Sequence, residues 1–182
     1  MHASVCDTLT DLVQNAIESG AARIETDVHT GPDRIELRVK DNGKGMDKTA
    51  LRRAVDPFFS EKGKHDRRRV GLGLPLLYQT AEAANGSVEV RSVPGQGTEV
   101  RFTLDARHVD APPLGDLPAT LVGLMAFEGT YELVLKRTTD TGSYAVSRSE
   151  LRDALGDLRE PACLTLAKRF FEANEASLTN GR

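Results

Sequence analysis

Residues 9–46, LTDLVQNAIESGAARIETDVHTGPDRIELRVKDNGKGM, predict a helix, a hairpin and a glycine-containing loop in direct succession. Apolar residues recur at helical spacing in the first part: Leu9, Leu12, Val13, Ala16 and Ile17. This spacing places one apolar stripe on a helix that ends at Gly20. Residues 22–30 and 33–41 then alternate polar and apolar side chains around a Gly-Pro-Asp turn, which predicts an antiparallel hairpin with one buried face.

The segment after this loop predicts more helices and a second hairpin. Helices are expected over residues 47–55, where Pro57 stops the first of them, and over residues 71–86, with a mobile, basic loop over 58–70 between them. Residues 87–93 and 97–105 alternate with period two around Pro-Gly-Gln-Gly, which predicts another hairpin. The chain therefore alternates helices with pairs of strands up to about residue 105.

Composition changes at residues 107–118, where three prolines and few core residues predict a linker. We therefore expect a first domain over residues 1–106 and a small α+β C-terminal unit over residues 119–182. In that unit the pattern predicts a helix near residues 119–127, a hairpin over 130–147, and helices over 148–157 and 161–177. The sequence does not assign this unit a role.

Bulk composition excludes several classes of protein. The 182 residues are 39% hydrophobic, enough for a real core, and their net charge of −3 gives no global attraction to nucleic acid or anionic membrane. Cys6 and Cys163 lie far apart, outside any spacing typical of a disulfide framework or zinc site. No apolar run approaches the roughly 20 residues that cross a bilayer, and the N-terminal residues lack a signal-peptide pattern. We expect a cytoplasmic protein.

The first predicted helix carries polar residues opposite its apolar stripe. Asp11, Asn15 and Glu18 share that side, and a solvated face accounts for them as well as a functional one does. The functional alternative needs a metal, because Mg²⁺ prefers a few hard oxygen ligands such as an Asn carbonyl, with phosphates and water completing its shell. Asp11, one turn earlier, would then orient or deprotonate a water.

Two glycine-containing segments suit a nucleotide. In DNGKGM the carboxylate of Asp41 can accept hydrogen bonds from an exocyclic amine, and the two glycines allow close approach to a flat ligand, although the same letters suit a tight turn. In GLGL, residues 71–74, paired glycines precede a helix whose first amides could hold phosphate, although a plain helix start fits equally. A P-loop motif is absent from the sequence.

The order and spacing of these motifs along the chain together indicate a protein family. The sequence resembles the GHKL superfamily, which includes gyrase, heat-shock chaperone ATPases, histidine kinases and mismatch-repair ATPases. Five boxes appear in the order of that superfamily: DLVQNAIESGA, DNGKGM, DPFFSEK, GLGL and GQGT. The resemblance covers residues 7 to about 105, and DPFFSEK together with residues 71–104, which begin with GLGL, is similar to the catalytic domains of sensor histidine kinases. It implies an α/β fold class: an α+β two-layer sandwich of the Bergerat type, with a mixed, mostly antiparallel sheet covered on one face by helices.

The resemblance also implies a site for ATP and Mg²⁺. Asn15 would bind Mg²⁺, and Asp11 would be catalytic. Asp41 would recognise the adenine amine, while Gly43 and Gly45 would line the base and Thr98 would support the adenine end. Lys62 and the amides near Gly71, Gly73 and Leu74 would face the phosphates. Phe58 and Phe59 would anchor a lid, although core packing is an alternative for this pair. The lid's basic residues, Lys64 and Arg67 to Arg69, either contact phosphate or form a solvated run of charge.

The chain departs from the kinase pattern in ways that bear on function. None of His2, His29, His65 or His108 lies in a predicted amphipathic helix typical of a phosphoacceptor. We therefore expect a stand-alone kinase-type catalytic domain that transfers a phosphoryl group to a partner protein in signalling.

Other departures point toward the hydrolytic relatives. The acidic residue Glu18 after the asparagine is similar to the mismatch-repair group, which hydrolyses ATP. That group uses Glu as its base where this chain has the shorter Asp11. It also takes a lysine from a following domain, and the sequence around Lys136 is too generic to assign that role to it. The alternatives are a slow ATPase that acts as a nucleotide-dependent switch, and a regulatory ATP-binding module without catalysis.

Overall fold

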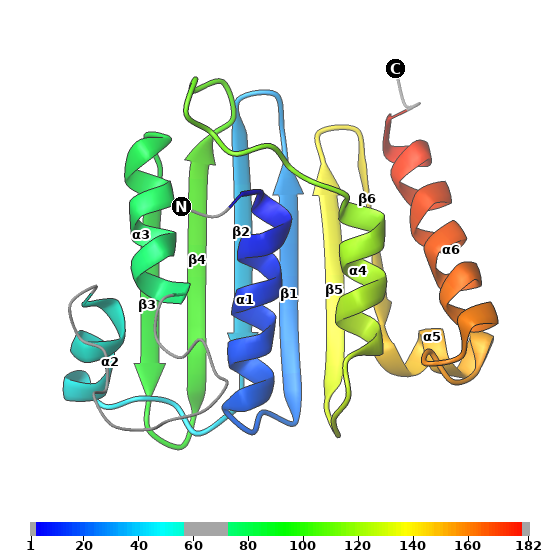
Figure 1. Cartoon of the computed structure of the whole chain (residues 1–182), viewed down its shortest axis with the longest axis horizontal. Coiled ribbons are helices and arrows are strands. Elements are labelled where there is room, and N and C mark those ends of the chain that lie inside the picture. Colours follow the sequence, from blue (N-terminus) through cyan, green and yellow to red (C-terminus); the bar gives the residue numbers. More distant parts are fainter. Residues whose placement is uncertain (1–2, 57–72, 180–182) are drawn as a thin grey trace.

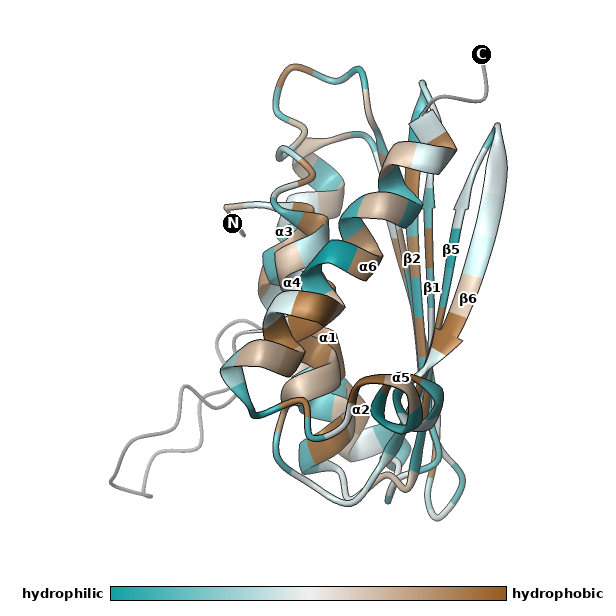
Figure 2. Ribbon diagram, turned by 90° about the vertical axis from the view of Figure 1, so that its right-hand side faces the viewer, coloured by the Kyte–Doolittle hydropathy of each residue, from teal (hydrophilic) through white to brown (hydrophobic). Residues whose placement is uncertain are grey.

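The computed structural model describes residues 3–56 and 73–179, which form one six-stranded sheet with helices packed on one of its faces (Figure 1). The strands are β1 Arg23–Thr30, β2 Arg34–Asp41, β3 Ser87–Val93, β4 Gly97–Asp105, β5 Glu132–Thr139 and β6 Gly142–Ser147. The helices are α1 Val5–Glu18, α2 Lys48–Val55, α3 Gly73–Ala83, α4 Leu117–Ala126, α5 Arg148–Leu155 and α6 Pro161–Thr179. Figure 2 shows α1, α3, α4 and α6 on the same side of the sheet.

The sheet order is β3-β4-β2-β1-β5-β6. The predicted hairpins β1–β2, β3–β4 and β5–β6 are all confirmed as antiparallel pairs, and β2 also pairs antiparallel with β4. Only β1 and β5, among the described strands, pair in parallel. The predicted two-layer sandwich with a mixed, mostly antiparallel sheet is therefore confirmed.

The C-terminal strands continue the same sheet, whereas the sequence predicts a separate unit after a linker. Strand β5 pairs with β1 along its whole length, from Arg23 opposite Glu132 to Thr30 opposite Thr139. Within residues 107–118, the carbonyls of Pro113 and Leu114 accept hydrogen bonds from the amides of Val5 and Cys6, at 2.9 and 3.0 Å. These amides belong to the first turn of α1, which has no partners of its own for them. The segment is thus part of the packed structure at the start of α1.

The two faces of the sheet differ in chemistry. Buried apolar side chains from alternate strand positions face the helices, among them Ile24, Leu37, Phe102, Leu133 and Leu135. The other face carries cross-strand ion pairs: the guanidinium of Arg38 lies 2.8 Å from Asp27 Oδ2 and 3.0 Å from Glu99 Oε1. The guanidinium groups of Arg38 and Arg101 lower the pKa of Glu99. This face is solvated, which is usual for one face of a largely antiparallel sheet.

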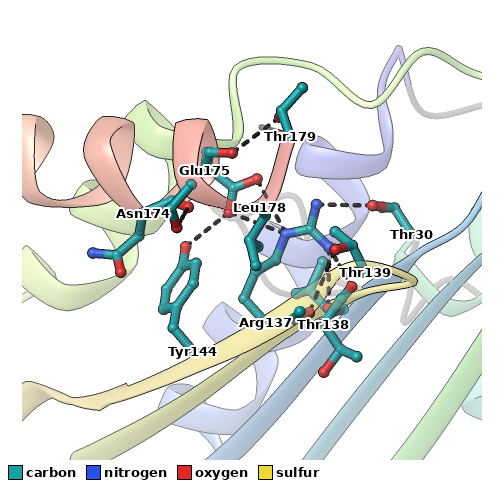
Figure 3. Close-up of polar contacts among 12 residues, drawn as sticks. Thr30, Arg137, Thr138, Thr139, Tyr144, Asn174, Glu175, Leu178 and Thr179 are labelled. Atoms are coloured by element: carbon teal, nitrogen blue, oxygen red, sulfur yellow. Dashed lines mark hydrogen bonds and ion pairs between the residues drawn. The ribbon is translucent and has the colours of Figure 1, made fainter. Parts of the chain in front are cut away.

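A buried arginine fastens α6 to the sheet (Figure 3). The Arg137 side chain on β5 is 3% exposed, and its Nε donates to both carboxylate oxygens of Glu175 on α6, at 3.1 and 3.2 Å. Its Nη2 donates to Thr30 Oγ1 at 2.8 Å, and its Nη1 donates to the Thr138 carbonyl at 2.7 Å. The hydroxyl of Tyr144 donates to the same Glu175 at 2.8 Å. Burial, together with this carboxylate, raises the pKa of Tyr144 far above its ordinary value.

Candidate functional site

Helix α1 places its polar side chains along one side. The helix begins at an N-cap, where Ser4 Oγ accepts from the Asp7 amide at 3.1 Å, and it ends before Gly20, whose φ is +78°. The apolar stripe is buried except for Ile17, which is half-buried like Asp11, whereas Asn15 and Glu18 are exposed. Asp11 and Asn15 therefore lie one turn apart on the side of α1 that faces away from the core.

The loop that follows β2 is attached to the end of α1. Asp41, the last residue of β2, is 8% exposed, and its Oδ1 accepts from the Gly43 amide at 2.7 Å and from Ser19 Oγ at 3.2 Å. The Lys44 amide donates to the Ser19 carbonyl at 3.1 Å. No group among the described residues donates a hydrogen bond to Asp41 Oδ2, and this oxygen is not a fully buried atom that lacks a partner. One carboxylate oxygen is thus held in place while the other is available to a ligand.

Glycines allow this loop to touch its neighbours. A Cβ on Gly43 would lie 1.8 Å from Ser19 Oγ, and a Cβ on Gly45, where φ is +62°, would lie 2.0 Å from the Val93 carbonyl oxygen. Gly97, with φ of +101°, packs against Asp41 from the other side, because its Cβ would lie 1.9 Å from the Asp41 carbonyl oxygen. A side chain at Gly43 or Gly97 would therefore collide with Asp41 or its partner Ser19, and a side chain at Gly45 would collide with the end of β3.

Gly97 and Gly95 make a matched pair for testing this contact. Both have positive φ, but nothing lies within 4 Å of a Cβ on Gly95. We expect Gly97→Ala to lower the free energy of unfolding by about 1–3 kcal/mol more than Gly95→Ala does, because only the first overpacks the strand end. Denaturant unfolding of both variants measures the difference. Equal losses would mean that the approach of Gly97 to Asp41 is unimportant.

Hydroxyl groups connect the loop to strands β3 and β4. Thr98 Oγ1 lies 2.8 Å from Ser92 Oγ, and Ser92 Oγ accepts from the Met46 amide at 2.8 Å. Thr98 is predicted from the sequence as a site residue, whereas Ser92 and Ser19 are not. Their only sequence signal was position, Ser19 just before the glycine that ends α1 and Ser92 opposite Thr98 in the predicted hairpin, and serine is common at both kinds of place.

The start of α3 lies beside Asn15. A Cβ on Gly73, the first residue of α3, would lie 3.3 Å from Asn15 Nδ2. Leu74 follows in the first turn of α3 and is half-buried. Asn15 is thus next to Gly73, and Asp41 accepts a hydrogen bond from Ser19, the C-cap residue of α1, one turn after Asn15. The three elements that carry Asn15, Asp41 and Gly73 therefore meet around the C-terminal half of α1.

Several predicted site residues lie outside the described residues: Phe58, Phe59, Lys62, Lys64, Arg67, Arg68, Arg69 and Gly71. Their proposed roles at the phosphates and in the lid stay predictions.

The described part of the site suits a nucleotide with a cation. It offers an acceptor carboxylate beside a glycine-containing loop, the side-chain amide of Asn15 on α1, and the first amides of α3 next to that side-chain amide. Residues 3–56 and 73–179 contain no cluster of three or more His, Cys, Asp or Glu that could hold a metal ion. This donor set fits Mg²⁺, which binds few protein oxygens when phosphates and water supply the rest.

Fold and site together define an ATP-binding domain built as a two-layer sandwich. The family described as "Histidine kinase-, DNA gyrase B-, and HSP90-like ATPase" matches residues 3–108. The chain belongs to this family, and the resemblance stated from the five boxes is confirmed. The matched region ends just after β4.

Among curated relatives, the chain is 35% identical over 96 residues to "Sensor histidine kinase YxdK" of Bacillus subtilis, which covers 50% of this chain and 30% of that protein. It is 33% identical over 117 residues to "Non-motile and phage-resistance protein" of Caulobacter vibrioides, covering 60% of this chain and 14% of that one. The chain thus spans less than a third of the length of these relatives.

A solved structure, the N-terminal domain of a DNA repair protein, has a similar fold, with a TM-score of 0.56 and 16% identity. The match covers 90% of this chain and 59% of that one, so the shared fold includes part of the C-terminal segment. None of the helices within residues 3–56 and 73–179 is long and apolar enough to cross a membrane.

Proposed function

We propose that this chain binds Mg²⁺–ATP as a catalytic domain of the histidine-kinase type and transfers the γ-phosphoryl group to a partner protein. The observation that carries the proposal is the Asp41 carboxylate, with Oδ1 anchored by Gly43 and Ser19 and Oδ2 without a partner among the described residues. A fixed acceptor of this kind, beside a glycine-containing loop, suits the exocyclic amine of adenine. The kinase relatives give independent support.

The proposal assigns roles to predicted site residues that the structure describes. Asp41 accepts from the amine, Gly43 and Gly45 present backbone to the base, and Thr98 supports the same end of the ligand. Asn15 supplies one oxygen to Mg²⁺, and the amides of Gly73 and Leu74 donate to phosphate oxygens. Bound Mg²⁺ neutralises charge on the phosphates, while the protein contributes position and hydrogen-bond donors rather than covalent chemistry.

The phosphoacceptor is proposed to lie on a partner protein. Of the histidines in the described residues, His29 is in strand β1 and His108 is in the turn after β4, so neither is on a helix. His2 and His65 lie outside the described residues. A partner that presents its acceptor at the exposed side of α1 would meet the phosphate end of the site, next to Asn15 and Gly73.

A slow ATPase that switches conformation is the second candidate. It is favoured by the place of Asp11, half-buried one turn before Asn15, where it could activate a water. Lys136, the candidate for the lysine of the hydrolytic relatives, is exposed on β5 between the buried Leu135 and Arg137. Successive strand residues point to opposite faces, so Lys136 points away from the helix layer and the site.

Asp11→Asn separates the two candidates. Because transfer to a partner needs no water-activating base, we expect this variant to release phosphate at the wild-type rate and to keep its ATP affinity. In the switch alternative, loss of a general base lowers phosphate release by about 100-fold or more. Glu18→Gln, an exposed carboxylate on the same side of α1, is the matched control. A drop confined to Asp11→Asn would replace the kinase proposal with the ATPase.

A further inference from the structure

Arg148, the first residue of α5, holds the loop between α4 and β5. Its Nε donates to the Met125 carbonyl at 2.9 Å, and its Nη2 donates to the Phe127 carbonyl at 3.0 Å. Its Nη1 donates to the carbonyls of Gly129 and Tyr131, at 3.2 and 2.9 Å. The guanidinium also lies over the Tyr131 ring, with Cζ 4.3 Å from the ring centroid. One half-buried side chain therefore fixes the course of this loop.

The end of this loop is bonded to the segment that connects α1 to β1. The Glu132 amide, which follows Tyr131, donates to the Ala22 carbonyl at 2.8 Å. The Glu132 carboxylate accepts from the Ser149 amide at 3.1 Å, so the first turn of α5 holds both Tyr131 and Glu132. From Arg23 and Glu132 onward, β1 and β5 pair in parallel. Figure 1 shows α5, the start of β5 and the connection from α1 to β1 at the same end of the sheet.

The same connecting segment is bonded to the glycine-containing loop of the proposed site. The Arg23 amide donates to Asn42 Oδ1 at 2.8 Å, and the Asn42 amide donates to the Arg23 carbonyl at 3.2 Å. Asn42 lies between Asp41 and Gly43, two of the residues that the proposed function places at adenine. A connected series of backbone and side-chain hydrogen bonds therefore leads from α5, through the starts of β5 and β1, to this loop.

The loop needs such support, because Asn42 is exposed and burial does little to hold it. A binding loop that is already fixed in the bound conformation binds more tightly, since less ordering remains to be done when the ligand arrives. We propose that Arg148 is a positioning residue for the ATP site, which acts through Asn42 and keeps the glycine-containing loop in the position that binds nucleotide. The matched family region ends at residue 108, so this support comes from a part of the chain outside it. The inference rests on the proposed function.

Titration calorimetry of the full chain with a non-hydrolysable ATP analogue tests this role. We expect Arg148→Met to weaken binding about tenfold, the cost of ordering the loop when the ligand binds. Asn42→Ala should weaken binding by a similar factor, because it removes the acceptor at the other end of the series. The double variant should bind about as Asn42→Ala alone does, because Arg148 acts through Asn42. A residue that only stabilises the fold would not give this coupling.

Arg137→Met is the matched control. Arg137 also joins the C-terminal segment to the sheet, but it lies opposite Val28, toward the other end of β1 from Arg23. Below its melting temperature, this variant should bind the analogue with the affinity of the wild type. Equal losses of affinity in Arg148→Met and Arg137→Met would overturn the positioning role, because general loss of stability would then explain both.

The remaining outcomes separate this role from the ATP site itself. Unchanged affinity in a folded Arg148→Met, or losses that add in the double variant, would overturn the positioning role and leave the ATP site standing. If Arg148→Met does not fold, Arg148→Lys takes its place, because lysine keeps the charge but lacks the planar set of donors, and it should still bind more weakly than the wild type. Wild-type affinity in Arg148→Lys would then overturn the role. A folded wild type that does not bind the analogue overturns the proposed function as well.

Discussion

Asp41→Asn should weaken ATP binding by at least about a hundredfold. The substitution keeps the shape of the side chain, and its remaining oxygen can still accept from Gly43, as Oδ1 does at 2.7 Å. Where the free carboxylate oxygen stood, however, the variant can place only an NH₂ group opposite the NH₂ of adenine. Two donors then face each other in a closely packed site, where Asp41 is 8% exposed, and a site whose polar group is left unpaired loses much of its affinity.

Asp27→Asn is the matched control for this variant. Asp27 lies on β1, on the open face of the sheet, where it pairs with Arg38 at 2.8 Å. The Asp27→Asn variant should bind ATP with the affinity of the wild type. Calorimetry gives the affinities, and melting temperatures show that Asp41→Asn remains folded. Unchanged ATP affinity in a folded Asp41→Asn would contradict the assignment of adenine to this carboxylate.

Arg137→Met should cause the largest loss of stability. It removes the guanidinium that holds Glu175 and leaves that carboxylate, 20% exposed, with Tyr144 as its remaining contact in the cluster of Figure 3. Breaking a buried ion pair on one side typically costs several kcal/mol, and with Glu175 partly solvated we expect about 2–4 kcal/mol. For a chain of this size the melting temperature should fall by roughly 5–15 °C.

Two further variants isolate the cause. Lys168→Met removes an exposed partner of Glu172 at 3.8 Å, and it should change stability by no more than about 0.5 kcal/mol. Arg137→Met combined with Glu175→Leu should be more stable than Arg137→Met alone, because no unpaired carboxylate remains. If Arg137→Met melts within about 2 °C of the wild type, the cluster does not hold α6 to the sheet.

Local patterns predicted the elements that they encode directly. Alternation with period two and the turn residues between strands were enough for the three hairpins, and Gly20 marked the end of α1. The chemistry of DNGKGM and the order of the boxes both predict Asp41 and Gly43 as site residues, and the structure joins them through a hydrogen bond. Their binding of a base stays a prediction, which the Asp41→Asn variant tests.

Long-range contacts carried no such signal. The parallel pairing of β1 with β5 joins residues more than a hundred positions apart, and neither strand encodes its partner. The proline content of residues 107–118 predicts a spacer. Composition cannot show that the carbonyls of Pro113 and Leu114 accept hydrogen bonds from the first amides of α1. The sequence does not predict Ser19 and Ser92 as site residues, because the role of a hydroxyl depends on the groups that it contacts in the folded chain.

Titration calorimetry of the wild-type chain with a non-hydrolysable ATP analogue, with and without Mg²⁺, tests the central claim most directly. We predict one binding site whose affinity rises when Mg²⁺ is present, because Asn15 and the phosphates then share a cation next to the start of α3. Absence of heat at any accessible concentration in both conditions, from a folded protein, would contradict the proposal that these residues form an ATP site.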